Sequence, residues 1–124
     1  MDETLYDQVG GDRFFERLVE AFYGAVDLDE VLRPMYPDDL TESKRHLKLF
    51  LEQYWGGPDT YMKERGHPRL RLRHAPFRIT KKARDAWLVA MTSALQSLRP
   101  ELTDAQFTDL SAYFDMAAHQ LRNV

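Results

Sequence analysis

His74 is the residue around which a chemical site is most easily built. It lies in the segment Arg71–Ile79, where Pro76 excludes regular helix and Pro68 bounds the segment upstream. One imidazole with cations and apolar side chains around it would suit a flat, apolar ligand with an acidic edge, such as haem. The neighbours that supply the charge and the apolar cover are Arg71, Arg73, Arg78, Leu72, Phe77 and Ile79.

The three other histidines do not form a competing metal site. His46, His67 and His119 lack partners at a spacing suited to zinc, and the chain has no cysteine. A lone histidine is more often structural or exposed than a ligand, so His74 needs support from the rest of the chain.

Three polar aromatic residues could give that support. Tyr23, Tyr36 and Trp87 all fall on or beside apolar helical faces, and buried Tyr and Trp normally find hydrogen-bond partners. Spacing alone favours three core aromatics bonded to backbone carbonyls. The alternative is one pocket in which three donors converge on a ligand opposite His74.

Length and composition predict a single soluble domain over residues 1–124. The chain is 44% hydrophobic and 30% charged, with a net charge of -3. The lack of cysteine excludes disulfides, thiolate nucleophiles, iron–sulfur clusters and cysteine-ligated haem, and fits a cytoplasmic protein. We find neither a signal peptide nor an apolar stretch that could span a bilayer.

The positive charge is concentrated in one segment. Residues 63–84 contain nine Lys or Arg and one acidic residue, Glu64. Such a segment could attract phosphates, a carboxylated cofactor or an acidic partner. A nucleic-acid module is the alternative, but no recognition-helix pattern accompanies the charge, and we expect no nucleic-acid partner.

The apolar periodicity predicts an all-α protein with four main helices. A stripe at three- and four-residue spacing predicts a helix from an Asp12 cap to Val26, and further helices follow Thr41, Thr80 and Thr103. The segment from Asp59 to Ile79 shows no sustained period and is predicted to be a long, functional loop.

Beyond these patterns, the sequence resembles the group II, or O-type, truncated haemoglobins. The resemblance runs in family order over nearly the whole chain, and its two longest blocks are highly specific. The residues that carry it are Val9–Gly11, Phe22–Tyr23, Leu32–Pro37, Phe50–Pro58, Arg65–Ile79 and Arg84–Leu88.

The resemblance implies a truncated globin fold, a two-over-two helical sandwich around haem b, with the proximal helix largely replaced by a loop. It makes His74 the iron ligand and Tyr23, Tyr36 and Trp87 the distal residues that stabilise a bound ligand. The other expected cofactor-binding residues are Ser43 near the ligand gate, Leu47 and Phe50 in the apolar pocket, Arg73 with Tyr61 or His46 at the propionates, and Leu70, Phe77, Ile79 and Met91.

The resemblance also implies binding of dioxygen and other diatomic ligands. Donation from Tyr and Trp would slow oxygen release, which favours oxygen, nitric oxide or peroxide chemistry over bulk oxygen transport. The alternative is a non-catalytic oxygen sensor or store. The sequence assigns no catalytic residue and does not decide between turnover of the nitric oxide dioxygenase or peroxidase kind and simple binding. A reductase and a homodimer are the further partners expected.

Overall fold

The computed structural model describes residues 3–124, and its regular elements in that range are all helical, as predicted. None of these helices is both long and apolar enough to cross a membrane. In chain order the elements are α1 (Leu5–Gln8), α2 (Asp12–Asp27), the 3₁₀ turn η1 (Arg33–Met35), α3 (Thr41–Tyr54), α4 (Thr60–Arg65), α5 (Leu70–His74), α6 (Lys81–Ser97), the 3₁₀ turn η2 (Arg99–Glu101) and α7 (Asp104–Leu121).

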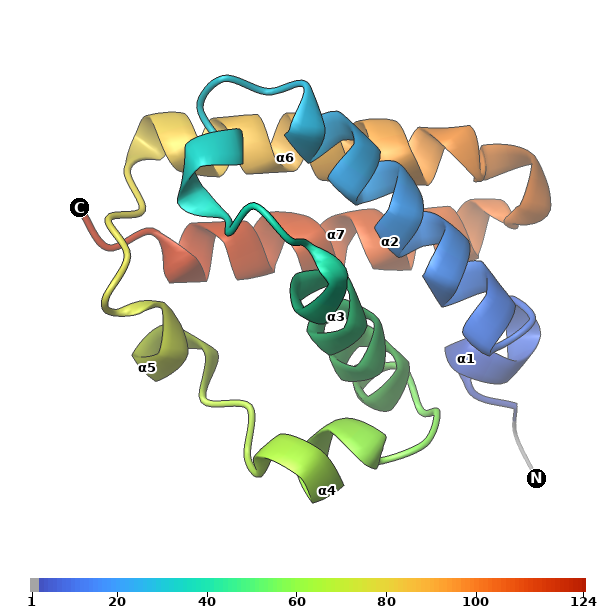
Figure 1. The fold of residues 1–124 in the computed structure, drawn as a ribbon. Helices are drawn as coiled ribbons and strands as arrows, with labels where there is room; N and C mark the ends of the chain where they lie inside the picture. Colours follow the sequence, from blue (N-terminus) through green and yellow to red (C-terminus); the bar gives the residue numbers. More distant parts are fainter. Residues whose placement is uncertain (1–2) are drawn as a thin grey trace.

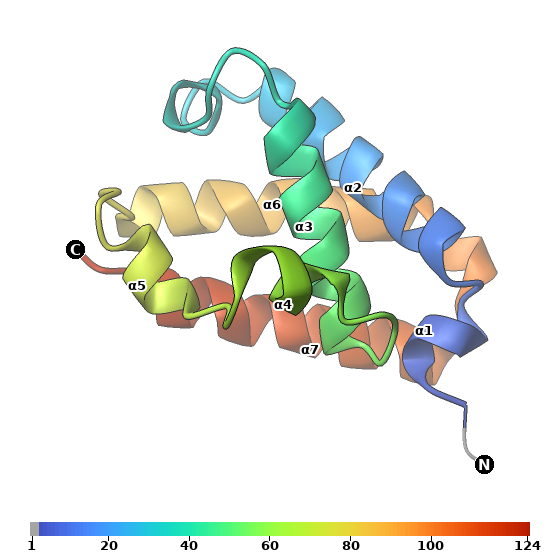
Figure 2. The same cartoon turned by 60° about the horizontal axis from the view of Figure 1, so that its bottom comes forward.

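The four long helices form two crossed layers. Figures 1 and 2 show α2 and α3 lying over the antiparallel pair α6 and α7, with the C-terminal end of α7 beside α5. The core lies between the layers, where the α2 stripe of Phe15, Leu18 and Phe22 is fully buried. This arrangement confirms the predicted two-over-two sandwich.

Two helix starts agree with the sequence signals and two differ. Thr80 and Thr103 cap α6 and α7 through their side chains. Asp12 instead occupies the first turn of α2 after Gly11, and its carboxylate forms an ion pair with Lys48 Nζ at 2.9 Å. An acid is favourable at either position because the helix N-terminus carries partial positive charge. Thr41 likewise begins α3 rather than capping it.

The chain turns sharply after α3 because two glycines have no space for a side chain. Gly56 has φ of +94°, and a Cβ there would lie 2.5 Å from Thr4. A Cβ on Gly57 would lie 2.8 Å from the Glu52 carbonyl oxygen. The chain can therefore reverse tightly and carry α4 back along α3.

The predicted long loop at residues 59–79 is in part wrong, because it contains the short helices α4 and α5. Gly66 and Arg69 interrupt the segment with φ values of +78° and +42°. Helices this short bury too little to show an apolar period, and α5 has no buried residue at all. His74 therefore ends a helical turn rather than lying in extended chain.

Candidate functional site

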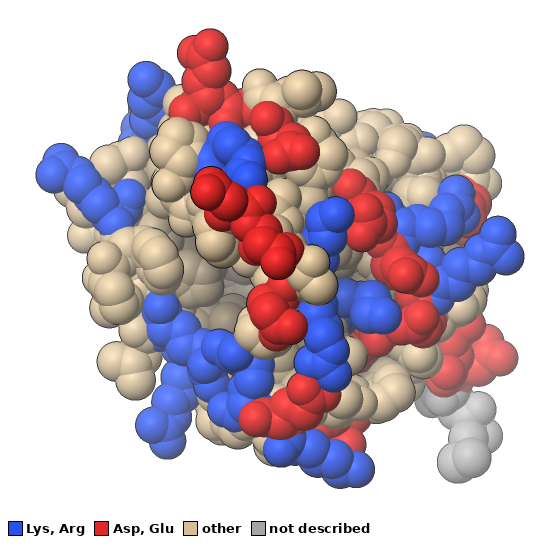
Figure 3. Space-filling model, in the orientation of Figure 1, with Lys and Arg blue, Asp and Glu red and all other residues tan. Residues whose placement is uncertain are grey.

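A cavity of about 410 Å³ opens between the two layers and α5. Figure 3 shows a hollow on this face, with basic side chains gathered over its lower rim. The cavity brings together nearly all of the residues that the sequence predicts for the site: Tyr23, Tyr36, Ser43, His46, Leu47, Phe50, Tyr61, Leu70, Arg73, His74, Phe77, Ile79 and Trp87.

Met91 is the exception among the predicted site residues. It is 1% exposed and packs in the core, one helical turn beyond Trp87 on α6. Both residues follow the same apolar stripe, so periodicity cannot distinguish the part of α6 that faces the cavity from the part that faces the core.

His74 is oriented by the backbone of its own helix. Its Nδ1 lies 2.7 Å from the Leu70 carbonyl oxygen, an acceptor, so this nitrogen carries the proton. The other ring nitrogen, Nε2, then has a free lone pair. Fixing the tautomer through the second nitrogen is how proteins commonly prepare an imidazole for a metal.

Tyr23, Tyr36 and Trp87 line the same cavity from α2, the turn after η1, and α6. The rings of Tyr23 and Tyr36 meet edge to face at 5.5 Å, and Phe22 lies between Tyr23 and Trp87 with centroid distances of 5.0 and 5.4 Å. The Tyr23 hydroxyl donates to the Ser43 carbonyl at 3.4 Å. The Trp87 indole lies near the Tyr36 hydroxyl.

Both tyrosines keep their hydroxyl protons at any physiological pH. Burial raises the pKa of Tyr23 well above its usual value, and the nearby Tyr36 raises it further. Burial also raises the pKa of Tyr36, to about 12, while the nearby Trp87 indole N–H partly opposes the shift. Tyr23, Tyr36 and Trp87 therefore offer two phenol donors and one indole donor to the cavity.

Two arginines flank Tyr61 at the cavity mouth. Their guanidinium carbons each lie 5.9 Å from the Tyr61 ring centroid, one from Arg65 and one from Arg73. Arg73 is largely committed to the backbone, since its Nε donates to the Pro68 carbonyl at 2.7 Å and Nη2 donates to the Arg65 carbonyl at 2.8 Å.

Arg65 instead reaches His46, with 3.1 Å between Nη1 and Nε2. Burial lowers the pKa of His46, and the positive charge of Arg65 lowers it further, which favours the neutral imidazole that can accept this bond. Sequence reasoning did not single out Arg65, because it is one of nine basic residues in an aperiodic segment.

Sequence reasoning also missed much of the apolar wall. Phe114, Ala117 and Leu121 follow the apolar period of α7, and that period does not distinguish a cavity wall from the core. The additional lining residues are Phe22, Leu32, Met35, Pro37, Leu51, Arg65, Ala83, Arg84, Tyr113, Phe114, Ala117, Ala118 and Leu121.

The donor set fits an iron porphyrin. One imidazole has Nε2 available to a metal, the walls are mostly apolar, and the arginines at the mouth would suit the carboxylates of a porphyrin.

Comparisons with known proteins agree with this site. Residues 4–120 match the family described as bacterial-like globin. Group 2 truncated hemoglobin YjbI of Bacillus subtilis is 48% identical over 85 residues, which cover 68% of this chain and 64% of that protein. The match thus spans slightly less than two thirds of YjbI.

Two solved structures share the whole fold. The hemoglobin of the thermophilic bacterium Chloroflexus aurantiacus is 45% identical, with a TM-score of 0.95 over 99% of this chain and 100% of that one. The truncated oxygen-avid haemoglobin of Bacillus subtilis is 38% identical, with a TM-score of 0.91 over 98% of this chain and 100% of that one. The chain therefore belongs to the bacterial-like globins and, within them, to the group II truncated haemoglobins.

Proposed function

We propose that the cavity holds haem b, with His74 as the one protein ligand of the iron. The observation that carries the proposal is that a histidine with a free Nε2 and three polar aromatic donors line the same apolar cavity. When bound, haem would supply the iron that takes up a diatomic ligand. The protein supplies the imidazole, the apolar walls and the hydrogen-bond donors.

The donors favour tight retention of dioxygen. Tyr23 and Tyr36 are protonated, and Trp87 offers an indole N–H. Donation to a partly charged ligand in a desolvated site contributes about 1–3 kcal/mol per bond. Because about 1.4 kcal/mol corresponds to tenfold, two such bonds slow oxygen release by about a hundredfold or more. Slow release suits oxygen chemistry better than bulk transport.

The reaction that uses a retained dioxygen most directly is the oxidation of nitric oxide. Nitric oxide, dioxygen and one electron give nitrate, in which both oxygen atoms are retained. The chain has no flavin or nicotinamide fingerprint of its own, so the electron comes from an external reductase. The cavity residues hold the dioxygen and exclude water, and peroxide is the alternative substrate for the same site.

The test uses the purified ferrous protein. An ultraviolet–visible spectrum establishes haem binding, and stopped-flow mixing measures oxygen dissociation. Nitric oxide is then added to the oxygenated protein, and nitrate is counted per haem with and without an electron donor. We expect slow oxygen release, one nitrate per haem without the donor and repeated turnover with it.

Two results would count against the proposal. Fast oxygen release, or nitric oxide consumption without nitrate, would exclude the dioxygenase function. Slow release without turnover of nitric oxide or peroxide in the presence of a donor would favour an oxygen sensor or store.

A further inference from the structure

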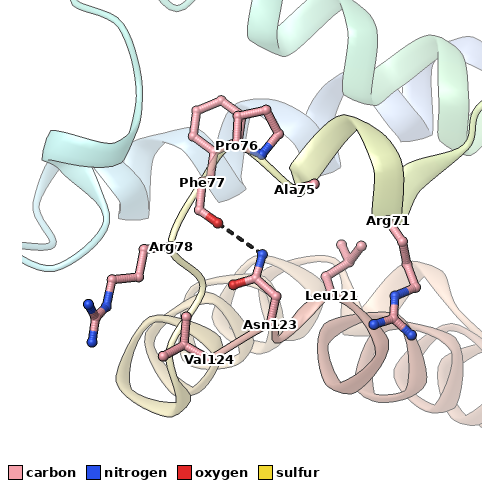
Figure 4. Close-up of a pocket in the computed structure, with 8 residues that line it drawn as sticks. All are labelled: Arg71, Ala75, Pro76, Phe77, Arg78, Leu121, Asn123 and Val124. Atoms are coloured by element: carbon pink, nitrogen blue, oxygen red, sulfur yellow. Dashed lines mark hydrogen bonds between the residues drawn. The ribbon is translucent and has the colours of Figure 1, made fainter.

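Asn123 links the end of α7 to the segment that follows His74. Its Nδ2 donates to the Phe77 carbonyl at 2.9 Å, the bond drawn in Figure 4, and lies 3.4 Å from the His74 carbonyl. Its Oδ1 accepts from the Ile79 N–H at 2.9 Å, and its own backbone N–H donates to the Ile79 carbonyl at 3.0 Å. One residue therefore engages three residues of the segment 74–79.

These bonds act where the segment has little other support. The helix α5 has no buried residue, and its principal packing partner is α7. On its N-terminal side, Arg73 reaches back to the carbonyls of Pro68 and Arg65. On its C-terminal side, Asn123 makes the corresponding hydrogen bonds to the backbone of residues 74–79. The backbone that carries His74 is thus fixed at both ends by polar contacts rather than by the core.

We propose that Asn123 is a positioning residue that sets the height and rotation of the His74 imidazole. The proposal rests on the assignment of His74 as the iron ligand. The bond from Nε2 to a metal is directional, so a shift of the backbone at His74 changes the strength of that bond. A clamp on the His74 and Phe77 carbonyls limits such shifts.

The carboxamide is suited to this place because it donates and accepts at once. Nδ2 satisfies carbonyls at the end of α5, and Oδ1 satisfies the Ile79 N–H. Asn123→Asp keeps the acceptor but places a carboxylate oxygen against the Phe77 carbonyl. Asn123→Ala removes all three side-chain hydrogen bonds and leaves the bond from its backbone N–H to the Ile79 carbonyl.

The test compares Asn123→Ala and Asn123→Asp with Gln120→Ala in the haem-loaded protein. Gln120 is an exposed neighbour whose side chain makes no hydrogen bond within residues 3–124, so its removal controls for effects on the end of α7. Resonance Raman spectroscopy of the ferrous protein measures the iron–histidine stretching band. Transfer of haem to an acceptor apoprotein measures the rate of haem loss, and circular dichroism measures the thermal midpoint.

We expect both Asn123 variants to shift and broaden the iron–histidine band, while Gln120→Ala keeps the wild-type band. Haem loss should accelerate roughly threefold to tenfold, the range for loss of one or two exposed hydrogen bonds. A purely structural role would lower the thermal midpoint and leave the band of the folded protein in place.

The outcomes separate this proposal from the assignment of His74. A wild-type protein with haem but without an iron–histidine band would overturn the assignment. A normal wild-type band that both Asn123 variants retain, with unchanged haem loss, would overturn the positioning role alone. If Asn123→Ala fails to fold, Asn123→Asp decides, because its carboxylate still accepts the hydrogen bond from the Ile79 N–H.

Discussion

The two walls of the cavity are built in opposite ways. The distal wall carries Tyr23 and Trp87 on α2 and α6, two long helices that pack against each other through buried apolar stripes. The proximal wall carries His74 on a five-residue helix with no buried residue, held by the polar contacts of Arg73 and Asn123. The donors are thus positioned by the core, whereas the proposed iron ligand is positioned by contacts that water can replace.

The strongest test of this contrast is removal of the proximal imidazole. His74→Ala should accelerate haem loss by about a hundredfold or more, since even outer-sphere changes at metal sites can cost 10–100-fold in affinity. Haem transfer to an acceptor apoprotein measures the rate. The exposed histidines provide controls, and His67→Ala and His119→Ala should lose haem at the wild-type rate. A His74→Ala protein with an unchanged five-coordinate histidine spectrum would disprove the assignment.

The second test compares the two walls with and without haem. Haem binds the native state and raises its stability by mass action, and Tyr61 is the one buried residue of the segment 59–79. Amide hydrogen exchange should show protection in that segment falling by about tenfold to a hundredfold in the apoprotein. The loss in α2 and α6 should be smaller. Equal protection of residues 59–79 in both forms would show that the proximal wall is ordered independently of haem.

The third test concerns a single donor on the distal wall. Trp87→Phe keeps an aromatic ring against Phe22 but removes the indole N–H, so fold and haem content should survive. Oxygen dissociation should accelerate about tenfold, corresponding to about 1.4 kcal/mol. Stopped-flow measurement of the wild type, Trp87→Phe, Tyr23→Phe and the double variant would reveal coupling as non-additive energies. An unchanged off-rate in Trp87→Phe would reduce Trp87 to a packing residue.

The fourth test concerns a buried carboxyl near the C-terminal end of α3, outside the cavity. Glu52 is 4% exposed on α3, and burial raises the pKa of its carboxyl to about 7, with a further contribution from Asp12. Because this pKa exceeds the ordinary value of 4.5, the folded state binds more protons than the unfolded chain does between pH 4.5 and about pH 7. The free energy of unfolding should therefore fall by about 1–2 kcal/mol as the pH rises through that window.

Urea denaturation at several pH values measures this dependence. Glu52→Gln should flatten it, whereas the exposed Asp109→Asn should keep the wild-type slope. Asp12 titrates in a different pH range, because its interaction with Lys48 lowers the pKa of its carboxyl below 3.8. Its contribution to the free energy of unfolding is therefore lost only in stronger acid. A Glu52→Gln protein with the wild-type slope would show that the buried carboxyl does not control this pH response.

The sequence predicted the distal half of the site better than the proximal half, and the reason is physical. Tyr23 and Trp87 lie on long amphipathic helices, so their stripes indicate that they face inward. The helices α4 and α5 are too short to show a stripe, and sequence reasoning predicted a loop there. Arg65 contacts the His46 side chain, and Asn123 bonds backbone groups across the fold. Such contacts leave no periodic signal.

Met91 illustrates the remaining limit. It follows Trp87 by one turn on the same face of α6, yet it contacts the core rather than the cavity. Which part of an apolar stripe borders a ligand depends on how far the opposite helix extends, and that is set by the tertiary fold.

The polar attachment of α5 also determines the route by which the cofactor can be loaded. Opening the distal side would require separating the buried stripes of α2 and α6, which costs much of the folding free energy. Opening the proximal side requires that the contacts of Arg73 and Asn123 be exchanged for water and that α5 leave its packing against α7. The four-helix frame can therefore assemble first and admit haem through the α5 side, so that cofactor insertion becomes a local event on a folded protein.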